Sequence, residues 1–149
     1  MRRILVLNGP NLGTLGEREP DVYGTGTLQD IEAALTERAR ELGVELRFAQ
    51  SNHEGALVDI LEAERTAAGC IINPGGLSHT SVVLADAVRA FGKPVIEVHL
   101  SNIFARESVR RVSLCAEAAA AVIAGFGARG YILALDGLVT MLDSDDQRG

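Results

Sequence analysis

The stretch Cys70–Val98, CIINPGGLSHTSVVLADAVRAFGKPVIEV, contains one complete strand–helix–strand unit. Its two ends, Cys70–Ile72 and Val95–Val98, are apolar runs rich in β-branched residues, and each is too short for a helix. Between them, Ser81–Phe91 has the apolar spacing of a helix and is followed by Gly92, a common helix terminator. A crossover of this length predicts two parallel strands in a right-handed βαβ unit.

The same alternation extends toward the N-terminus. Two more short apolar runs predict buried strands, and two amphipathic patterns that each precede a glycine predict helices. The strands are Ile4–Leu7 and Val44–Phe48, and the helices are Leu28–Leu42, with Thr27 as N-cap and Gly43 after it, and Ala56–Ala68, closed by Gly69.

The segment Ala116–Gly125 can be read in two ways. Its alanine content favours a helix, but the run Ala121–Ala124, between a polar stretch and a glycine, also fits a short buried strand. We prefer the strand, because Ala128–Leu142 then becomes the final covering helix. The acidic tail Asp143–Gly149 is expected to fray.

Five such units predict an α/β fold with a flavodoxin-like, doubly wound, five-stranded parallel sheet of order 2-1-3-4-5, in a single domain over residues 1–142. In sheets of this kind, ligands bind beyond the carboxyl ends of the strands, where the strand order reverses beside the first strand. That rule selects three loops: Asn8–Gly26, Asn73–Thr80 and His99–Glu107.

The charge balance excludes several classes of partner. The formal net charge is −6 and the isoelectric point is near 5.0, whereas nucleic acid and anionic membranes require clustered Lys and Arg. There is no apolar run of about 18 residues, and the N-terminal MRRILVLNGP turns polar too early for a signal peptide. We therefore expect a cytoplasmic protein with neither nucleic acid nor a membrane as partner.

Two further features of the composition bear on chemistry. Cys70 and Cys115 are far apart with no CxxC motif, which favours buried free thiols over a zinc site or a redox pair. Of the 14 basic residues, 13 are Arg. Because guanidinium groups bind carboxylates through paired hydrogen bonds, several of these arginines are candidates for ligand or subunit contacts.

The three selected loops are rich in groups that bind or transfer protons. Taken singly, each has an ordinary structural explanation: Asn73–Gly76 makes an adequate turn, and His79 can cap a helix. Their joint placement at one edge of the sheet favours a functional site. The groups are Asn8, Asn11, Arg18 and Tyr23 in the first loop, Asn73, His79 and Ser81 in the second, and His99, Ser101, Asn102, Arg106 and Arg110 in or just after the third.

These groups suit an elimination reaction. A tyrosine phenol is almost wholly protonated at neutral pH, but Arg18 can favour the ionised form of Tyr23 and so make it a general base. His99, at the end of a strand, is the natural proton donor. Asn11 can hydrogen bond to a developing enolate, and the backbone amides near Leu100 and Ser101 suit a carboxylate.

At these residues the sequence resembles the type II 3-dehydroquinate dehydratases, which remove water from 3-dehydroquinate to give 3-dehydroshikimate in the shikimate pathway of aromatic biosynthesis. The resemblance runs from the first strand to about Leu135. It rests on five motifs in the family's order and spacing: LNGPNLGTLGEREPDVYG, QSNHEG, INPGGLSHTSVVLADA, IEVHLSNIFARE and GYILAL.

The resemblance implies a role for each matching position. Tyr23 would abstract the proton beside the ketone with help from Arg18, and His99 would protonate the departing hydroxyl. The remaining expected site residues are Asn11, which steadies the enolate, and Asn73, His79, Leu100, Ser101 and Arg110, which hold the substrate.

The resemblance also implies an assembly. Asp86 would reach the site of a neighbouring subunit in a dodecamer of four trimers. Neither a metal nor an organic cofactor is implied. The chain departs from the family pattern at positions outside the catalytic set, namely Gly13, Ala85, Phe104, Val109 and Val112.

Other functions of the same fold are less well supported. Imine chemistry needs a lysine, and the only one, Lys93, precedes the fourth strand at the opposite edge. A phosphoacceptor receiver would carry carboxylates where Asn8 and Asn73 stand. No nucleotide-binding GxxxxGK[ST] is present, and Gly24–Gly26 does not continue as GxGxxG. A flavin-binding module and a catalytically idle scaffold remain as alternatives, and Tyr131 is interpreted as a packing residue.

Overall fold

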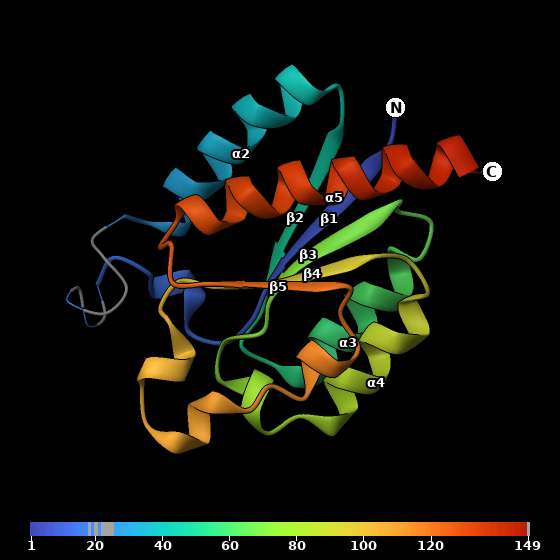
Figure 1. Ribbon diagram of the computed structural model, residues 1–149. Helices are drawn as coiled ribbons and strands as arrows, with labels where there is room; N and C mark the ends of the chain where they lie inside the picture. The colour runs from blue at the N-terminus through green and yellow to red at the C-terminus, as the bar shows by residue number, and fades with distance from the viewer. Residues whose placement is uncertain (18, 20, 22–25, 149) are drawn as a thin grey trace.

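The computed structural model describes residues 1–149 except 18, 20, 22–25 and 149. Five parallel strands form one sheet in the order β2-β1-β3-β4-β5 (Figure 1), which confirms the predicted α/β class and flavodoxin-like order. The strands are β1 (Arg3–Asn8), β2 (Glu45–Gln50), β3 (Gly69–Asn73), β4 (Val95–His99) and β5 (Ala121–Ala124).

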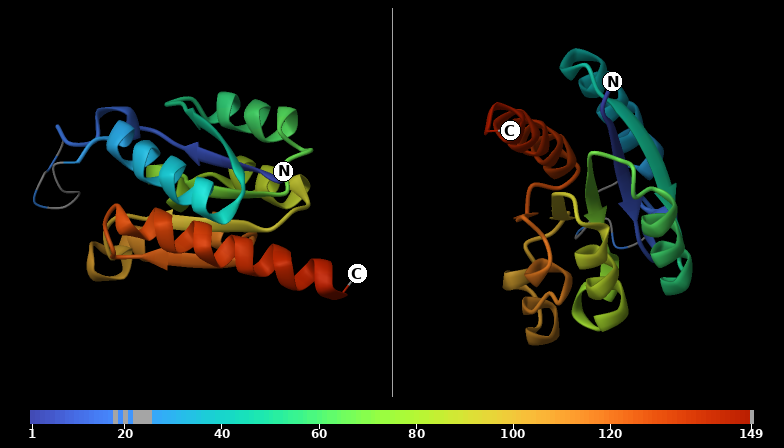
Figure 2. Two further views of the ribbon diagram at one scale, coloured as in Figure 1. Left: turned by 90° about the horizontal axis from the view of Figure 1, so that it is seen from above. Right: turned by 90° about the vertical axis from the view of Figure 1, so that its right-hand side faces the viewer.

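Helices cover both faces of the sheet (Figure 2). On one face lie α2 (Leu28–Leu42) and α5 (Arg129–Arg148), and on the other α3 (Glu54–Ala63) and α4 (Val82–Phe91). The connections contain five short 3₁₀ helices: η1 (Leu12–Thr14), η2 (Gly75–His79), η3 (Ile103–Ala105), η4 (Ser108–Arg111) and η5 (Cys115–Glu117). In the described part of the chain, none of the helices combines the length and apolarity needed to cross a bilayer.

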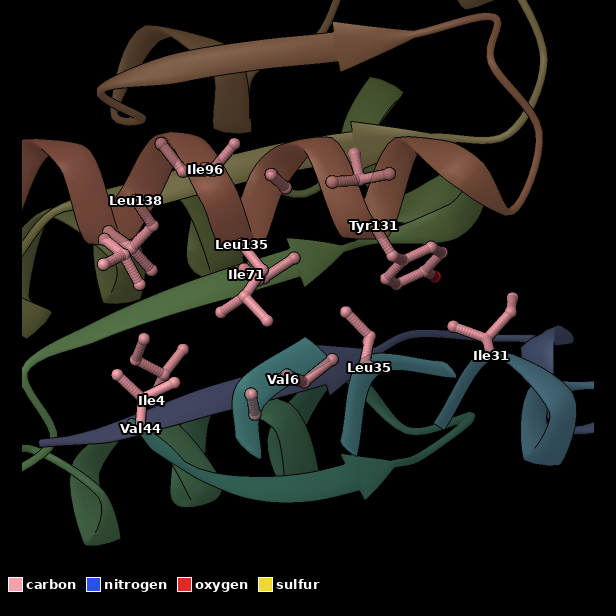
Figure 3. Packing of buried hydrophobic residues seen from close by; sticks show 14 of the residues in the cluster. Ile4, Val6, Ile31, Leu35, Val44, Ile71, Ile96, Tyr131, Leu135 and Leu138 are labelled. Carbon is pink, nitrogen blue, oxygen red and sulfur yellow. The ribbon is translucent and has the colours of Figure 1, made fainter. Parts of the chain in front are cut away.

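The two helical layers give the protein two cores. Ile4 and Val6 of β1 pack beneath α2 and α5, whereas Leu5 and Leu7 pack beneath α3 and α4. Successive side chains of a strand point to opposite faces, so a strand buried on both sides must be apolar at every position. Figure 3 shows the first of these cores, with Leu135 of α5 pointing onto the sheet.

Helix α2 begins and ends where the sequence predicts. The Thr27 side chain accepts the Asp30 N–H at 3.1 Å, and the Asp30 carboxylate accepts the Thr27 N–H at 3.0 Å, which is a reciprocal capping box. After the last turn, Gly43 has a φ of 72°. This left-handed conformation favours glycine, so the chain can turn directly into β2.

The helix after β2 is shorter than expected. We predicted Ala56–Ala68, but α3 ends at Ala63, and Gly69 begins β3 rather than closing a helix. Residues 64–68 turn the chain back onto the sheet, where the Ala68 N–H donates to the Arg3 carbonyl at 2.8 Å. Gly69 instead allows close packing, since a Cβ there would lie 3.0 Å from the Leu138 side chain.

The last helix is longer than expected. It continues from Arg129 to Arg148 instead of ending at Leu142, so the acidic residues that we expected to fray are helical as far as Arg148. Arg2 forms ion pairs with Asp143, at 2.6 Å, and with Asp146. These contacts attach the last turns of α5 to the start of the sheet.

Candidate active site

A pocket of about 110 Å³ lies at the carboxyl ends of β1, β3 and β4, the edge that the topology rule selects. Seven of the ten site residues expected from the sequence line it, and their chemical roles stay predictions. They are Asn11, Asn73, His79, His99, Leu100, Ser101 and Arg110.

The other three expected residues are not brought to this pocket. Arg18 and Tyr23 lie outside the described residues. Asp86, on α4, lines a different cavity of about 310 Å³ between α3 and α4, where it pairs with Arg89. Within a single chain, therefore, Asp86 does not contribute to the pocket at the strand ends.

The floor of the pocket is a close contact between two loops. The Gly9 N–H donates to the Asn73 carbonyl at 2.8 Å, and a Cβ at Gly9 would lie 2.5 Å from the Pro74 carbonyl oxygen. Gly75 has a φ of 60°, and a Cβ there would lie 2.9 Å from the Pro10 carbonyl oxygen. Only glycine permits both approaches, which explains why the loops after β1 and β3 are so rich in it.

Asn11 has an unusual backbone conformation that the chain supports from outside the loop. Its φ is 72°, in the left-handed region that Asn tolerates better than most residues. The Asn11 N–H donates to the Asn52 side-chain oxygen at 3.0 Å, and Gln50 donates to the same oxygen at 3.1 Å. The motif at residues 50–55 thus holds Asn11 at the pocket without lining it.

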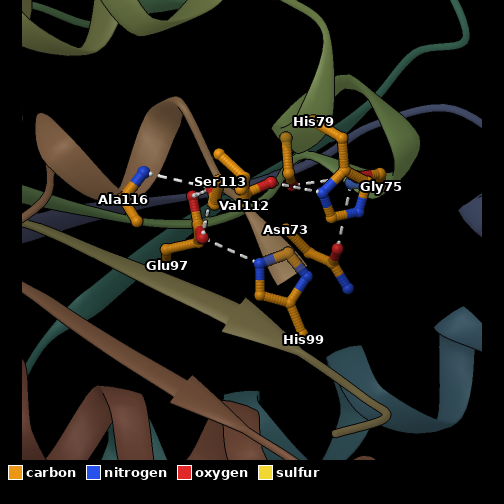
Figure 4. Close-up of polar contacts among 9 residues, drawn as sticks. Asn73, Gly75, His79, Glu97, His99, Val112, Ser113 and Ala116 are labelled. Carbon is orange, nitrogen blue, oxygen red and sulfur yellow. Dashed lines mark hydrogen bonds and ion pairs between the residues drawn. The ribbon is translucent and has the colours of Figure 1, made fainter. Parts of the chain in front are cut away.

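Two histidines stand side by side in the pocket (Figure 4). The rings of His79 and His99 are 6.4 Å apart between centroids and inclined by 22°. Nδ1 of His79 lies 2.7 Å from the Val112 carbonyl oxygen, which can only accept, so Nδ1 carries the proton in that bond. The second nitrogen of His79, Nε2, is thereby left for a ligand.

His99 is hydrogen-bonded through its other ring nitrogen, Nε2. Its Nε2 lies 2.7 Å from a carboxylate oxygen of Glu97, and both side chains are buried. An ionised carboxylate only accepts hydrogen bonds, so Nε2 carries a proton and His99 offers Nδ1 to a ligand. The two imidazoles therefore present different nitrogens to the same pocket.

Sequence reasoning missed Glu97 and underrated Arg106. Glu97 lies two residues before His99 in β4, and residues at that spacing share one face of a strand. A single acid in the otherwise apolar run VIEV was the signal that could have found it. Arg106 was noted only as a member of its loop, yet it lines the pocket beside Arg110.

The charged groups around the pocket give it a basic side. Arg106 and Arg110 line it, and Arg110 also pairs with Glu107, whose pKa lies below its ordinary value because of that hydrogen bond. Two guanidinium groups in one small pocket suit an anionic ligand. Among the described residues, no three His, Cys, Asp or Glu side chains cluster as metal ligands would.

Tyr131 lies directly behind the pocket and is fully buried. Its hydroxyl donates to the Asn8 side-chain oxygen at 2.6 Å and accepts from the Asn73 amide at 3.0 Å. Burial raises the pKa of Tyr131 above that of an ordinary phenol, so the hydroxyl keeps its proton and remains a donor. Tyr131 therefore has a role beyond packing, because its hydroxyl holds the side chain of Asn73.

Comparisons with known proteins point to one family. The sequence model of the family Dehydroquinase class II matches residues 2–139. Over 141 residues the chain is 55% identical to the 3-dehydroquinate dehydratase of Rhizobium meliloti (strain 1021), covering 94% of this chain and 95% of that protein. Over 136 residues it is 54% identical to 3-dehydroquinate dehydratase 1 of Agrobacterium fabrum (strain C58), covering 91% and 94%.

Solved structures agree with the sequence comparison. The crystal structure of the type II dehydroquinase from Propionibacterium acnes matches with a TM-score of 0.90 at 43% identity, covering 94% of this chain and 97% of that one.

The buried tyrosine network generates a test of stability. Tyr131→Phe removes both the donor to Asn8 and the acceptor for Asn73, and each is left buried with a lost partner. We expect a loss of about 1–3 kcal/mol, or a Tm lower by roughly 2–12 °C at fixed protein concentration. Thr140→Val, which removes an exposed helical hydroxyl, is the control and should change Tm little. An unchanged Tm in Tyr131→Phe would contradict this account of the network.

Proposed function

This chain belongs to the class II dehydroquinase family and is therefore a hydro-lyase, and we propose that it catalyses the reversible elimination of water from 3-dehydroquinate to give 3-dehydroshikimate. The observation that carries the proposal is that motifs distant in the sequence meet around one pocket that combines a buried Glu97–His99 pair with two arginines. We also propose that the protein is cytoplasmic and acts in the shikimate pathway.

The substrate is a cyclic hydroxy-ketone that carries a carboxylate, and the pocket offers groups for it. Arg106 and Arg110 line the pocket, and guanidinium groups bind carboxylates through paired hydrogen bonds. Leu100 and Ser101, which line the same wall, supply backbone amides for the carboxylate. His79, with Nε2 left for a ligand, and Asn73 hold the polar substituents of the ring.

We assign the general base to Tyr23, assisted by Arg18. Both lie outside the described residues, and the support comes from the residues that flank them. Leu15 is buried in the core, and Gly26 immediately precedes the cap of α2. Leu15 and Gly26 also line a cavity of about 570 Å³ that shares three residues with the pocket, namely Leu100, Ser101 and Arg106.

The proposed reaction has two proton transfers. The ionised phenol of Tyr23 takes the proton from the carbon beside the ketone, and the electron pair of that C–H bond forms an enolate. Asn11 donates an amide hydrogen bond that stabilises the enolate oxygen. The enolate then expels the hydroxyl from the neighbouring carbon, and His99 supplies the proton with which that hydroxyl leaves as water.

The surroundings of His99 support its role as the acid. An imidazole that delivers a proton must first carry a positive charge, and the buried Glu97 carboxylate offsets that charge at 2.7 Å. His79 has a neutral carbonyl in the equivalent place. The difference favours proton transfer by His99 and ligand binding by His79.

An imine mechanism has no support at this pocket. The only lysine in the sequence is Lys93. Its ammonium group donates to the Arg65 carbonyl at 2.5 Å, in the turn that precedes β4, at the other end of the strand from His99. We therefore propose that the ketone reacts directly, without a covalent bond to the enzyme.

The two proton transfers generate a test by substitution. Tyr23→Phe removes the base, and His99→Gln keeps an amide N–H for Glu97 but cannot deliver a proton. We expect each to lower kcat by at least about 100-fold with the fold retained, measured from the ultraviolet absorbance of the conjugated enone product and from circular dichroism. His53→Ala, at an exposed histidine outside the pocket, is the control.

Near-normal turnover in Tyr23→Phe or His99→Gln would remove that residue from the mechanism. A folded, oligomeric parent protein without turnover would instead favour a non-catalytic scaffold, and flavin absorbance in the purified protein would favour a flavin-binding module.

We further propose that Asp86 acts in a neighbouring subunit, within a dodecamer of four trimers. Asp86 is exposed on α4 and lines the groove between α3 and α4 rather than the pocket. The same surface carries the exposed apolar side chains of Val82 and Val83. Exposed apolar side chains beside a charged groove fit a contact between subunits.

Mixed oligomers test this assignment. Asp86→Ala and Tyr23→Phe subunits are each expected to form oligomers of very low activity. When the two are co-expressed with different affinity tags, a site is complete if an Asp86→Ala subunit lies next to a Tyr23→Phe subunit, so roughly a quarter of parental activity should return. If Asp86 acted within its own chain, no activity would return in the mixed oligomer.

A further inference from the structure

Ser113 lies behind the Glu97–His99 pair, in the connection between η4 and η5 (Figure 4). Its hydroxyl oxygen is 2.8 Å from one carboxylate oxygen of Glu97 and 3.0 Å from the other. The same hydroxyl oxygen accepts the Ala116 N–H at 3.1 Å. Nothing in the proposed reaction so far uses this residue.

These contacts have a fixed direction. A backbone N–H can only donate, so the Ala116 amide occupies an acceptor position of the Ser113 oxygen. An ionised carboxylate can only accept, so the Ser113 proton points to Glu97. The Glu97 carboxylate in turn accepts the proton on Nε2 of His99. Each hydrogen bond therefore constrains the next, from a backbone amide to the imidazole.

The burial of Glu97 increases the energetic importance of these hydrogen bonds. Glu97 is 0% exposed, and a buried carboxylate is costly unless hydrogen bonds replace the lost water. His99 and Ser113 supply such bonds from two sides. Without Ser113, the described residues orient the carboxylate only through the hydrogen bond to His99, and the His99 ring loses part of the support that selects its orientation and tautomer.

We propose that Ser113 is a positioning residue that holds the Glu97 carboxylate against Nε2 of His99 and so keeps Nδ1 of His99 directed to the substrate. The inference rests on the proposed role of His99 as the acid. It makes Ser113 a determinant of turnover rather than of substrate binding, because Ser113 acts on the proton donor and not on the groups that hold the substrate.

The segment that carries Ser113 is well placed to act on both histidines. Its neighbour Val112 provides the carbonyl that holds Nδ1 of His79. The next residue, Leu114, donates its N–H to the Ser78 carbonyl at 2.7 Å, which ties the segment to η2. The segment 112–114 therefore influences which ring nitrogen each histidine directs to the pocket, through the Val112 carbonyl for His79 and through the Ser113 hydroxyl and Glu97 for His99.

Substitutions at Ser113 test the proposal by separating kcat from KM. Ser113→Ala removes the hydroxyl, and we expect kcat to fall roughly 10- to 100-fold, the size associated with a hydrogen bond to a charged group, with KM changed less than about 3-fold. Ser113→Thr keeps the hydroxyl and should restore most of kcat. Ser108→Ala, at an exposed serine of η4, is the matched control.

A nitrogen NMR measurement tests the same proposal independently of turnover. The sequence has only three histidines, so ¹⁵N-histidine labelling gives few signals, which His53→Ala and His79→Ala variants assign. In the parent protein we expect His99 to carry its proton on Nε2. In Ser113→Ala we expect a mixture of the two tautomers.

Each outcome decides the proposal. A neutral His99 in the parent with its proton on Nδ1 instead of Nε2, an unchanged His99 signal in Ser113→Ala, or a loss of kcat in Ser113→Thr as large as in Ser113→Ala would overturn it. Absence of 3-dehydroquinate dehydration by the parent would refute the proposed function, and the nitrogen signals would still test the role of Ser113.

Discussion

The hydrogen bond between Glu97 and His99 is the interaction on which the site depends. Both residues lie in β4, a central strand with helices on both faces, where an unpaired carboxylate would cost about 3–5 kcal/mol. Their spacing of two residues places both side chains on one face of the strand. The contact with Glu97 therefore stabilises a buried carboxylate and also fixes the imidazole at the pocket.

The position of the pocket follows from backbone constraints at the neighbouring strands. The order of the sheet reverses between β1 and β3, so the loops that follow these strands diverge and leave space between them. The Gly9–Asn73 hydrogen bond holds the loops together at their base. Behind them, Tyr131 joins Asn8 and Asn73 across the two strands, so the side-chain oxygen of Asn8 and the amide nitrogen of Asn73 have a partner where water is excluded.

The sequence predicts the sheet, its order and the edge that bears the pocket, because apolar runs and glycine stops report directly on buried strands and helix ends. It does not identify residues whose role depends on tertiary contacts. Gly69 was read as a helix stop, whereas it makes room for Leu138. Glu97 was missed because the importance of a lone acid in a strand becomes clear only from its contact with His99. Asp86 was expected at the site, but it lies in the groove between α3 and α4.

The two histidines of the pocket have different surroundings. His99 is backed by a buried carboxylate and His79 by a neutral carbonyl, so a positive charge is offset on one ring and not on the other. The rings are near enough to repel each other if both were charged. The surroundings therefore offset a positive charge better on His99 than on His79, which fits the proton transfer proposed for His99 and the substrate binding proposed for His79.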